Sequence, residues 1–156
     1  MSGPSDWPLP EDGVRFVVSH PLLNALQRNA LTRGLYLRAV GYYPNARGHR
    51  VNQDHHTDDL LLYCVGGEGS LRVHGCDYPV TKGDLLLPPK GAPHSYGASA
   101  HRPWTVYWMH FSGLDVDAFW QHLGHSDKDG VTHVGVTSRL TGALENSATK
   151  GLLGKL

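Results

Sequence analysis

Side chains that could contact a ligand or hold a metal follow a rigid turn in the middle of the chain. The stretch from Gly83 to Tyr96 holds a short apolar run, two prolines and then His94. Because proline donates no backbone hydrogen bond, Pro88-Pro89 should end a strand at a fixed point, and Gly91 lets the chain reverse. We therefore expect His94 to open the next strand in a fixed position. The pattern alone leaves two roles open for this histidine: a ligand contact, or a hydrogen-bonded core residue.

The spacing of Gly83, Pro89, Gly91 and His94 resembles the second sequence motif of the cupin superfamily. Ala98 stands where that motif ends in asparagine. The resemblance implies a barrel in which the histidine points inward.

Residues 48–67 have the spacing of the first cupin motif, with Asp54 and Leu60 where the metal sites of the superfamily carry histidine and glutamate. One alternative follows. Asp54, His56 and His94 would form a set of two histidines and one carboxylate suited to iron, as in a cupin dioxygenase or sugar isomerase. Because Leu60 takes the fourth ligand place, we expect no metal or other cofactor and no catalysis, and keep the metal-dependent enzyme as the alternative.

Composition excludes several other classes of function. The 156 residues suit one domain with a substantial core. Fourteen basic and fourteen acidic residues cancel, so the chain lacks the positive field that non-specific DNA binding requires. Neither a membrane-spanning apolar run nor a secretion signal is present, and we expect no membrane partner and a cytoplasmic location.

Short strands separated by glycine-rich turns are dense in the second half of the chain. They predict a mainly β fold, because parallel sheets need long crossover connections that are missing here. We expect a cupin-like, jelly-roll barrel of the double-stranded β-helix type, with C-terminal helices packed outside. The expected strands cover residues 16–18, 35–43, 60–65, 70–74, 78–80, 85–87, 104–111 and 131–136, beginning again at His94 after the proline turn.

The strand over residues 104–111 is expected to close the barrel. Alternation places Trp104, Val106, Trp108 and His110 on one face, and the other face is also apolar. A strand with two apolar faces needs a cover outside the barrel.

Two helices could supply the cover. The first has Val116, Phe119, Trp120 and Leu123 on one side and ends at Gly124. The second begins near Ser138 and carries a leucine stripe that could pack on the barrel or form a dimer seam. Its members are Leu140, Leu144, Ala148, Leu152 and Leu156.

The first half of the chain is expected to be less regular. Residues 1–15 are proline-rich and should form an extended arm, and residues 19–31 predict a short helix with Ser19 as its N-cap. The polar residues 47–59 predict a rim loop. With the arm removed, residues 16–113 form the expected barrel and residues 114–156 the helical segment.

The run from Leu62 to Gly69, the stretch from Gly83 to Ala98 and the segment from Pro103 to Gly113 together resemble the effector-binding domain of AraC-type transcription regulators. Membership implies that a sugar or another small-molecule effector binds inside the barrel, with an arm able to fold over it, and we expect a sugar or polyol here. It also implies a homodimer through the C-terminal helices. DNA would be bound only by a helix-turn-helix domain further along the polypeptide, and the second helix pattern is still running at Leu156.

The resemblance also suggests contact residues. Trp108 matches the aromatic position that stacks on the sugar in the arabinose-responsive member, and Tyr96 matches a pocket tyrosine. An indole beside a hydroxyl-bearing ring suits a sugar or polyol, whose C–H faces stack and whose hydroxyls need directed partners. Arg50, His94 and His110 are the further expected ligand contacts. For Trp104 we favour core packing.

Overall fold

The computed structural model describes residues 7–54, 56–122 and 130–149. The helices are α1 (His20–Arg28), α2 (Val116–His122) and α3 (Ser138–Thr149). The strands are β1 (Val14–Val17), β2 (Tyr36–Tyr43), β3 (Arg50–Gln53), β4 (Asp59–Gly66), β5 (Glu68–Val73), β6 (Cys76–Thr81), β7 (Asp84–Leu86), β8 (His94–Ala98), β9 (Thr105–Ser112) and β10 (Val131–His133).

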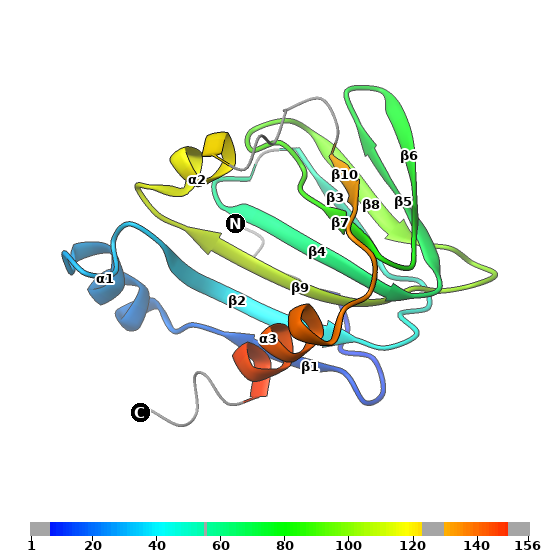
Figure 1. The fold of residues 1–156 in the computed structure, drawn as a ribbon, viewed down its shortest axis with the longest axis horizontal. Helices are drawn as coiled ribbons and strands as arrows, with labels where there is room; N and C mark the ends of the chain where they lie inside the picture. Colours follow the sequence, from blue (N-terminus) through cyan, green and yellow to red (C-terminus); the bar gives the residue numbers. More distant parts are fainter. Residues whose placement is uncertain (1–6, 55, 123–129, 150–156) are drawn as a thin grey trace.

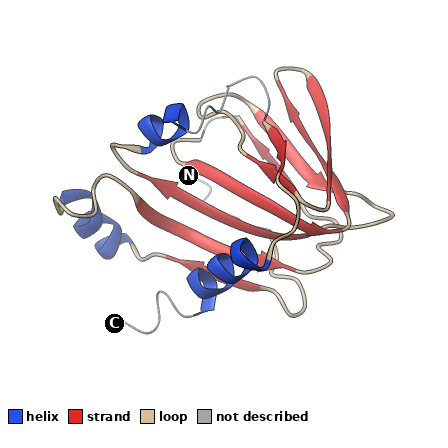
Figure 2. Ribbon diagram, viewed as in Figure 1, coloured by secondary structure: helices blue, strands red, loops and turns tan. Residues whose placement is uncertain are grey.

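The strands form two antiparallel sheets that enclose the core (Figure 1). One sheet has six strands in the order β1-β2-β9-β4-β7-β10, and the other has four in the order β3-β8-β5-β6. The helices lie around the strands and none lies between the sheets (Figure 2). This confirms the expected mainly β, cupin-like barrel with helices outside.

Side-chain alternation divides the apolar residues between the interior and one outer face. On β4, Leu60, Leu62 and Cys64 join the core between the sheets, whereas Tyr63 belongs to a second cluster outside. The interior cluster draws on both sheets, as expected when two inner faces pack on each other. Trp104 is fully buried in this cluster, consistent with core packing.

The outer cover of β9 comes from α3. Leu144, only 4% exposed, packs with Tyr63 and Tyr107, and Leu140 lies beside them. The leucine stripe therefore packs on its own barrel up to Leu144, and Leu152 and Leu156 lie outside the described residues. In Figure 1, α3 crosses the face of the six-stranded sheet near β1 and β2.

The other expected cover, α2, reaches only the end of β9. Phe119 is 52% exposed, and α2 follows the end of β9 and lies past it (Figure 1). Val116 is 1% exposed at the start of α2, and Trp120 also turns back to the barrel, where its ring centroid is 5.7 Å from that of Phe111. Leu123 and Gly124 lie outside the described residues.

Several element boundaries differ from expectation. The polar residues 47–59 were expected to be a loop, but they contain β3, because Val51 reaches the core while Arg50 and Asn52 face solvent. β1 begins at Val14, and α1 ends at Arg28 with no side-chain cap bond from Ser19. β10 extends the six-stranded sheet by pairing with β7.

No helix within the described ranges is long and apolar enough to cross a membrane.

Candidate functional site

The closing strand carries its aromatic residues as the alternation predicts. Trp104, Val106 and Trp108 belong to the interior cluster, whereas Tyr107 and Met109 belong to the outer one. His110, 6% exposed, shares the parity of Trp108, and the two rings are 5.7 Å apart. The two expected ligand contacts on β9, Trp108 and His110, therefore point into the barrel.

His94 and Tyr96 come from β8 and face the same interior. Their ring centroids are 6.0 Å apart with an interplanar angle of 15°. The proline turn acts as predicted: β7 ends at Leu86, Gly91 has φ of 77°, and β8 starts at His94. His94 Nδ1 then lies 3.0 Å from the carbonyl oxygen of Ala92.

The environment favours the neutral forms of both side chains. Burial raises the pKa of Tyr96, and Tyr43 and Asp58 raise it further, so its hydroxyl stays protonated. Burial also lowers the pKa of His94; the Ala92 carbonyl opposes this, and His56 and His110 add to it. The pair can therefore offer a hydroxyl and a neutral imidazole to a polar ligand.

Trp108 is held flat against the neighbouring strand. Gly41 is its cross-strand partner, and a β-carbon at position 41 would overlap the indole. Tyr43 lies 5.4 Å from the indole in an edge-on arrangement. The Nε1 atom of Trp108 is buried and has no hydrogen-bond partner among the described residues. Trp104, in contrast, donates from Nε1 to Nδ1 of His49 at 3.1 Å.

Two site residues escaped sequence reasoning. Asp58 Oδ2 lies 2.9 Å from Nδ1 of His110 and 3.6 Å from Nε of Arg38. Burial alone would raise the pKa of Asp58, but the hydrogen bond and charge of His110, together with Arg38, lower it overall. The carboxyl group therefore stays ionised.

The sequence marks one of these two residues and not the other. Asp58 precedes β4 by one residue and has the parity of the inward-facing Leu60 and Leu62, so alternation extended one residue before the strand would have found it. Arg38 sits where the pairing of β2 with β9 shifts register between Leu37 and Ala39. No sequence pattern marks such a bulge.

The alternative metal set is not brought together. His56 and His94 are close, with ring centroids 4.5 Å apart, but Asp54 is exposed. Both ring nitrogens of His56 face backbone carbonyls, at 2.7 Å from Asp58 and 3.2 Å from Pro89. Within the described ranges, no three His, Cys, Asp or Glu side chains are grouped to hold a metal ion.

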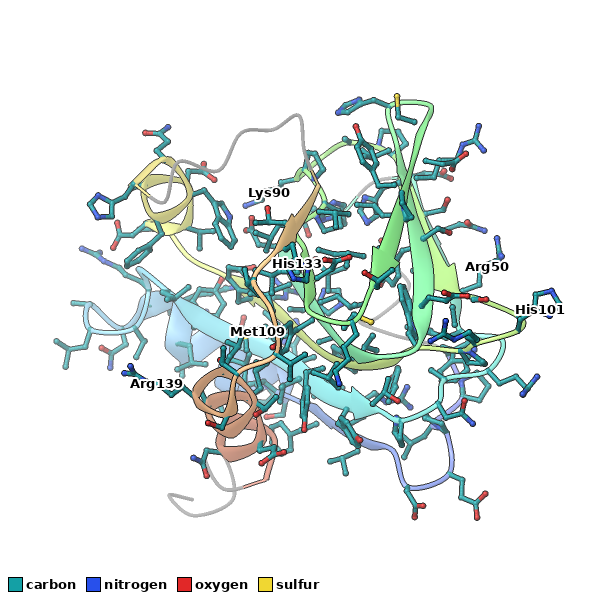
Figure 3. The ribbon with its side chains drawn as sticks, turned by 45° about the vertical axis from the view of Figure 1, so that its right-hand side comes forward. Arg50, Lys90, His101, Met109, His133 and Arg139 are labelled. Atoms are coloured by element: carbon teal, nitrogen blue, oxygen red, sulfur yellow. The ribbon has the colours of Figure 1, made fainter. Side chains whose placement is uncertain are left out.

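Arg50 does not join the interior residues. It is exposed on β3, next to the inward-facing Val51, and Figure 3 shows its side chain at the outside of the molecule. Neighbouring residues of a strand point to opposite faces, so the inward position of Val51 turns Arg50 to solvent.

The N-terminal segment reaches one end of the interior. The ring of Trp7 is 4.7 Å from that of His49 and 5.3 Å from that of Tyr43. Arg15 Nη1 donates to the carbonyl oxygen of Trp7 at 2.8 Å and to the hydroxyl of Tyr43 at 3.2 Å. Trp7 therefore covers the interior cluster on the side of His49.

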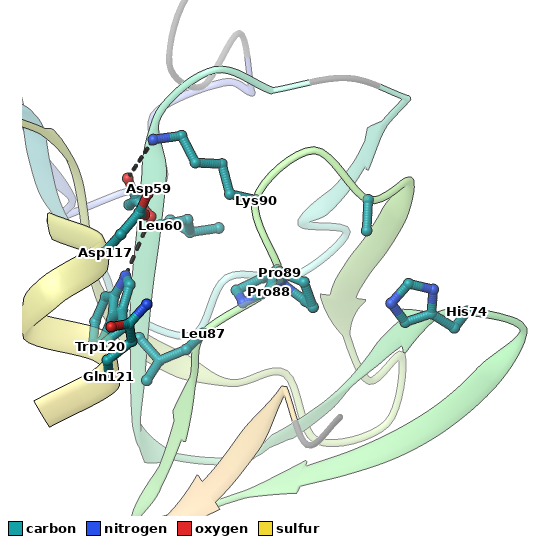
Figure 4. Close-up of a pocket in the computed structure, with 11 residues that line it drawn as sticks. Asp59, Leu60, His74, Leu87, Pro88, Pro89, Lys90, Asp117, Trp120 and Gln121 are labelled. Carbon is teal, nitrogen blue, oxygen red and sulfur yellow. Dashed lines mark hydrogen bonds and ion pairs between the residues drawn. The ribbon is translucent and has the colours of Figure 1, made fainter. Parts of the chain in front are cut away.

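A hollow of about 580 Å³ lies beside α2 and reaches the interior cluster at Leu60. Its lining includes Leu60, Leu87, Pro89 and Trp120. Asp59 joins its two sides: it accepts from Trp120 Nε1 at 3.2 Å and pairs with Lys90 Nζ at 3.2 Å (Figure 4). These two contacts tie α2 to the loop that precedes His94.

Comparison with known proteins gives a consistent family. Residues 38–153 match the AraC-like ligand binding domain. The MmsAB operon regulatory protein of Pseudomonas aeruginosa is 39% identical over 149 residues, which cover 93% of this chain and 48% of that protein. The Lactose operon transcription activator of Staphylococcus xylosus is 33% identical over 57 residues, covering 36% of this chain and 20% of that protein. The chain thus spans at most about half the length of these curated relatives.

Among solved structures, the protein YhaK from Escherichia coli superposes with a TM-score of 0.53 and 16% identity, covering 88% of this chain and 56% of that one. This likeness concerns the fold alone.

Proposed function

Because the chain belongs to the AraC-like ligand-binding domain family, we propose that it senses a small-molecule effector inside its barrel. The observation that carries the proposal is the indole of Trp108. Its Nε1–H is buried without a hydrogen-bond partner in the described part of the chain, and a buried donor left unpaired is costly. An effector that accepts this hydrogen would remove the cost on binding.

The side chains around Trp108 suit a molecule with several hydroxyl groups. The indole supplies a flat apolar surface for C–H groups, and Tyr96 and His94 supply directed polar partners on the facing strand. His110 lies next to Trp108 on β9. We therefore propose a sugar or polyol skeleton, contacted by Trp108, Tyr96, His94 and His110.

We propose that Trp7 covers one end of the effector site and that the C-terminal helices form a homodimer contact. Trp7 already packs on Tyr43 and His49 at one end of the interior. The part of α3 up to Leu144 is occupied by the barrel, so the dimer contact must use other faces of the helical segment. Sedimentation should then show weak self-association, and a tight dimer that survives Leu152→Asp, a change on the remainder of the leucine stripe, would place the interface on the barrel.

We propose that the whole protein is a cytoplasmic regulator and that a separate domain of it binds DNA. Equal numbers of acidic and basic residues give this chain no positive field for DNA. The relatives matched in sequence are named as regulators, which supports sensing without catalysis. Metal analysis tests the alternative: iron, zinc or manganese that survives dialysis and is lost in His94→Ala would favour the cupin enzyme.

A thermal-shift screen followed by calorimetric titration with sugars and polyols tests the pocket. Tyr96→Phe removes one hydroxyl and almost no volume, so it should cost a bound ligand roughly 1–3 kcal/mol of affinity while leaving folding nearly unchanged. His94→Gln should weaken binding in the same direction.

Matched controls lie elsewhere on the chain. Tyr42→Phe alters a tyrosine that packs on the outer cluster, and His101→Gln alters an exposed loop histidine. Both should bind as the parent does. If Tyr96→Phe and His94→Gln also bind like the parent, the pocket is not in the barrel interior.

A further inference from the structure

Two buried hydrogen-bond donors stand out in the described part of the barrel. Trp108 Nε1 and Arg38 Nε are both buried without a hydrogen-bond partner among the described residues. Neither group can accept a hydrogen bond, so each needs an acceptor other than the described residues. Ser112 Oγ is also buried and unpaired, but a hydroxyl can either donate or accept and therefore says less.

The carboxylate nearest to these donors is already engaged. Asp58 Oδ2 lies 2.9 Å from Nδ1 of His110, which is a hydrogen-bond distance. Its separation from Arg38 Nε is 3.6 Å, close enough for an ion pair and too long for a hydrogen bond. Asp58 therefore offsets the charge of Arg38 and still leaves its Nε–H without an acceptor.

The two donors belong to one continuous group of side chains. Trp108 lies 5.7 Å from His110 between ring centroids, His110 contacts Asp58, and Asp58 faces Arg38. Arg38 directly precedes Ala39 on β2, and Ala39 is the cross-strand partner of His110 on β9. A small ligand over His110 would thus have an unpaired donor on either side of it.

The charges of this group tolerate an incoming anion. One carboxylate, Asp58, is balanced by the guanidinium of Arg38. The other titratable neighbours are the imidazoles of His56, His94 and His110 and the hydroxyls of Tyr43 and Tyr96. A hydroxyl that accepts from Trp108 or Arg38 brings a hydrogen that needs its own acceptor. A carboxylate brings only acceptors, and its hydrogen bonds are strengthened by charge.

We propose that the effector carries a carboxylate, held by the Nε–H of Arg38 and the Nε1–H of Trp108. The effector class is then a sugar acid or a smaller hydroxy acid, and not a neutral sugar. This proposal rests on the proposed function, since it specifies the chemistry of the molecule bound in the same barrel.

Pairs of probes that differ in the acid group alone test it on the unaltered chain. Suitable pairs are gluconate with glucitol, galacturonate with galactose, and glycerate with glycerol. Calorimetric titration and thermal shift should show at least one acid binding tenfold or more tightly than its neutral partner. The pair that responds also separates a sugar acid from a short hydroxy acid.

Variants then locate the acid group. Arg38→Gln and Trp108→Phe should each weaken binding of the acid about tenfold or more and reduce its preference over the neutral partner. Arg72→Gln is the matched control, because it removes an arginine from an exposed ion pair with Asp77. It should leave the acid affinity unchanged.

Three other outcomes are possible, and each would refute a specific part of the proposal. If a neutral probe binds as tightly as its acid, the carboxylate proposal is wrong while sensing in the barrel stands. An acid that binds Arg38→Gln and Trp108→Phe as it binds the parent also refutes the carboxylate contact. If no acid and no neutral probe binds, both this proposal and the sugar or polyol effector fail.

Discussion

The indole of Trp108 lies flat over Gly41 on the neighbouring strand, in the space that any other side chain at position 41 would fill. A β-carbon built there would overlap Cε2 and Cζ2 and would stand 2.6 Å from Nε1. The position of the proposed ligand surface therefore depends on a residue that offers no side chain of its own.

Gly41→Ala should displace the indole, because backbone on one side and packed rings on the other leave it little room. Overpacking of this kind typically costs about 1–3 kcal/mol of unfolding free energy, measured by urea titration. Ligand response should fall as well. Gly142→Ala is the control: nothing lies within 4 Å of its added carbon, so the helix α3 should gain up to about 1 kcal/mol. An unchanged stability in Gly41→Ala would show that the indole is not held as described.

Leu144→Ala should separate α3 from the barrel. Leu144 is 4% exposed against Tyr63 and Tyr107, and Tyr107 also donates to Glu145 Oε1 at 2.8 Å. Truncating a buried leucine costs about 2–5 kcal/mol, which urea unfolding would measure. Leu31→Ala is the control, since Leu31 is 94% exposed and should change stability very little. Equal effects of the two variants would contradict the packing of α3.

The sequence alone predicts those features of the fold that depend on residues close together in the chain. Pro88-Pro89 ends β7 and Gly91 turns the chain, so the opening of β8 at His94 follows from residue types alone. Period-two alternation likewise placed Trp108 and His110 on one face of β9. Both conclusions depend on residues close together in the chain.

Long-range contacts account for most of what the sequence did not show. Arg38 reaches Asp58 because a register shift turns it, and a shift depends on the partner strand. The polar residues around Arg50 have little intrinsic strand signal and became β3 through pairing with β8. Likewise, the choice between α2 and α3 as the cover of β9 depends on where each connection leads.

Acid should destabilise the fold through His49. Burial lowers the pKa of His49 from 6.5 to about 4. Between these values the unfolded chain binds a proton that the folded chain excludes, so stability falls as the pH drops from about 6.5 toward 4. The difference corresponds to roughly 3 kcal/mol at most. The lowered pKa of His94 acts in the same direction, whereas Asp58 loses its contribution only at lower pH, below its ordinary value of 3.8.

Urea titrations at pH 7 and pH 4.5 measure the effect. His49→Gln keeps an acceptor for Trp104 and removes the titrating ring, so its stability should change less between the two pH values than that of the parent. His101→Gln, in an exposed loop, should leave the pH dependence intact. If His49→Gln is as acid-sensitive as the parent, the buried imidazole is not the cause.

The central claim is that the effector binds at Trp108 inside the barrel, and the indole N–H signals of the four tryptophans test it most directly. In a ¹H–¹⁵N spectrum, Trp104 and Trp120 start with internal acceptors, His49 and Asp59, whereas Trp108 starts with none among the residues that the structure describes. Titration with whichever sugar or sugar acid gives the largest thermal shift should move the Trp108 signal most, with Trp108→Phe providing its assignment. A titration that moves the Trp120 signal and leaves that of Trp108 in place would put the ligand in the hollow beside α2 and contradict the account.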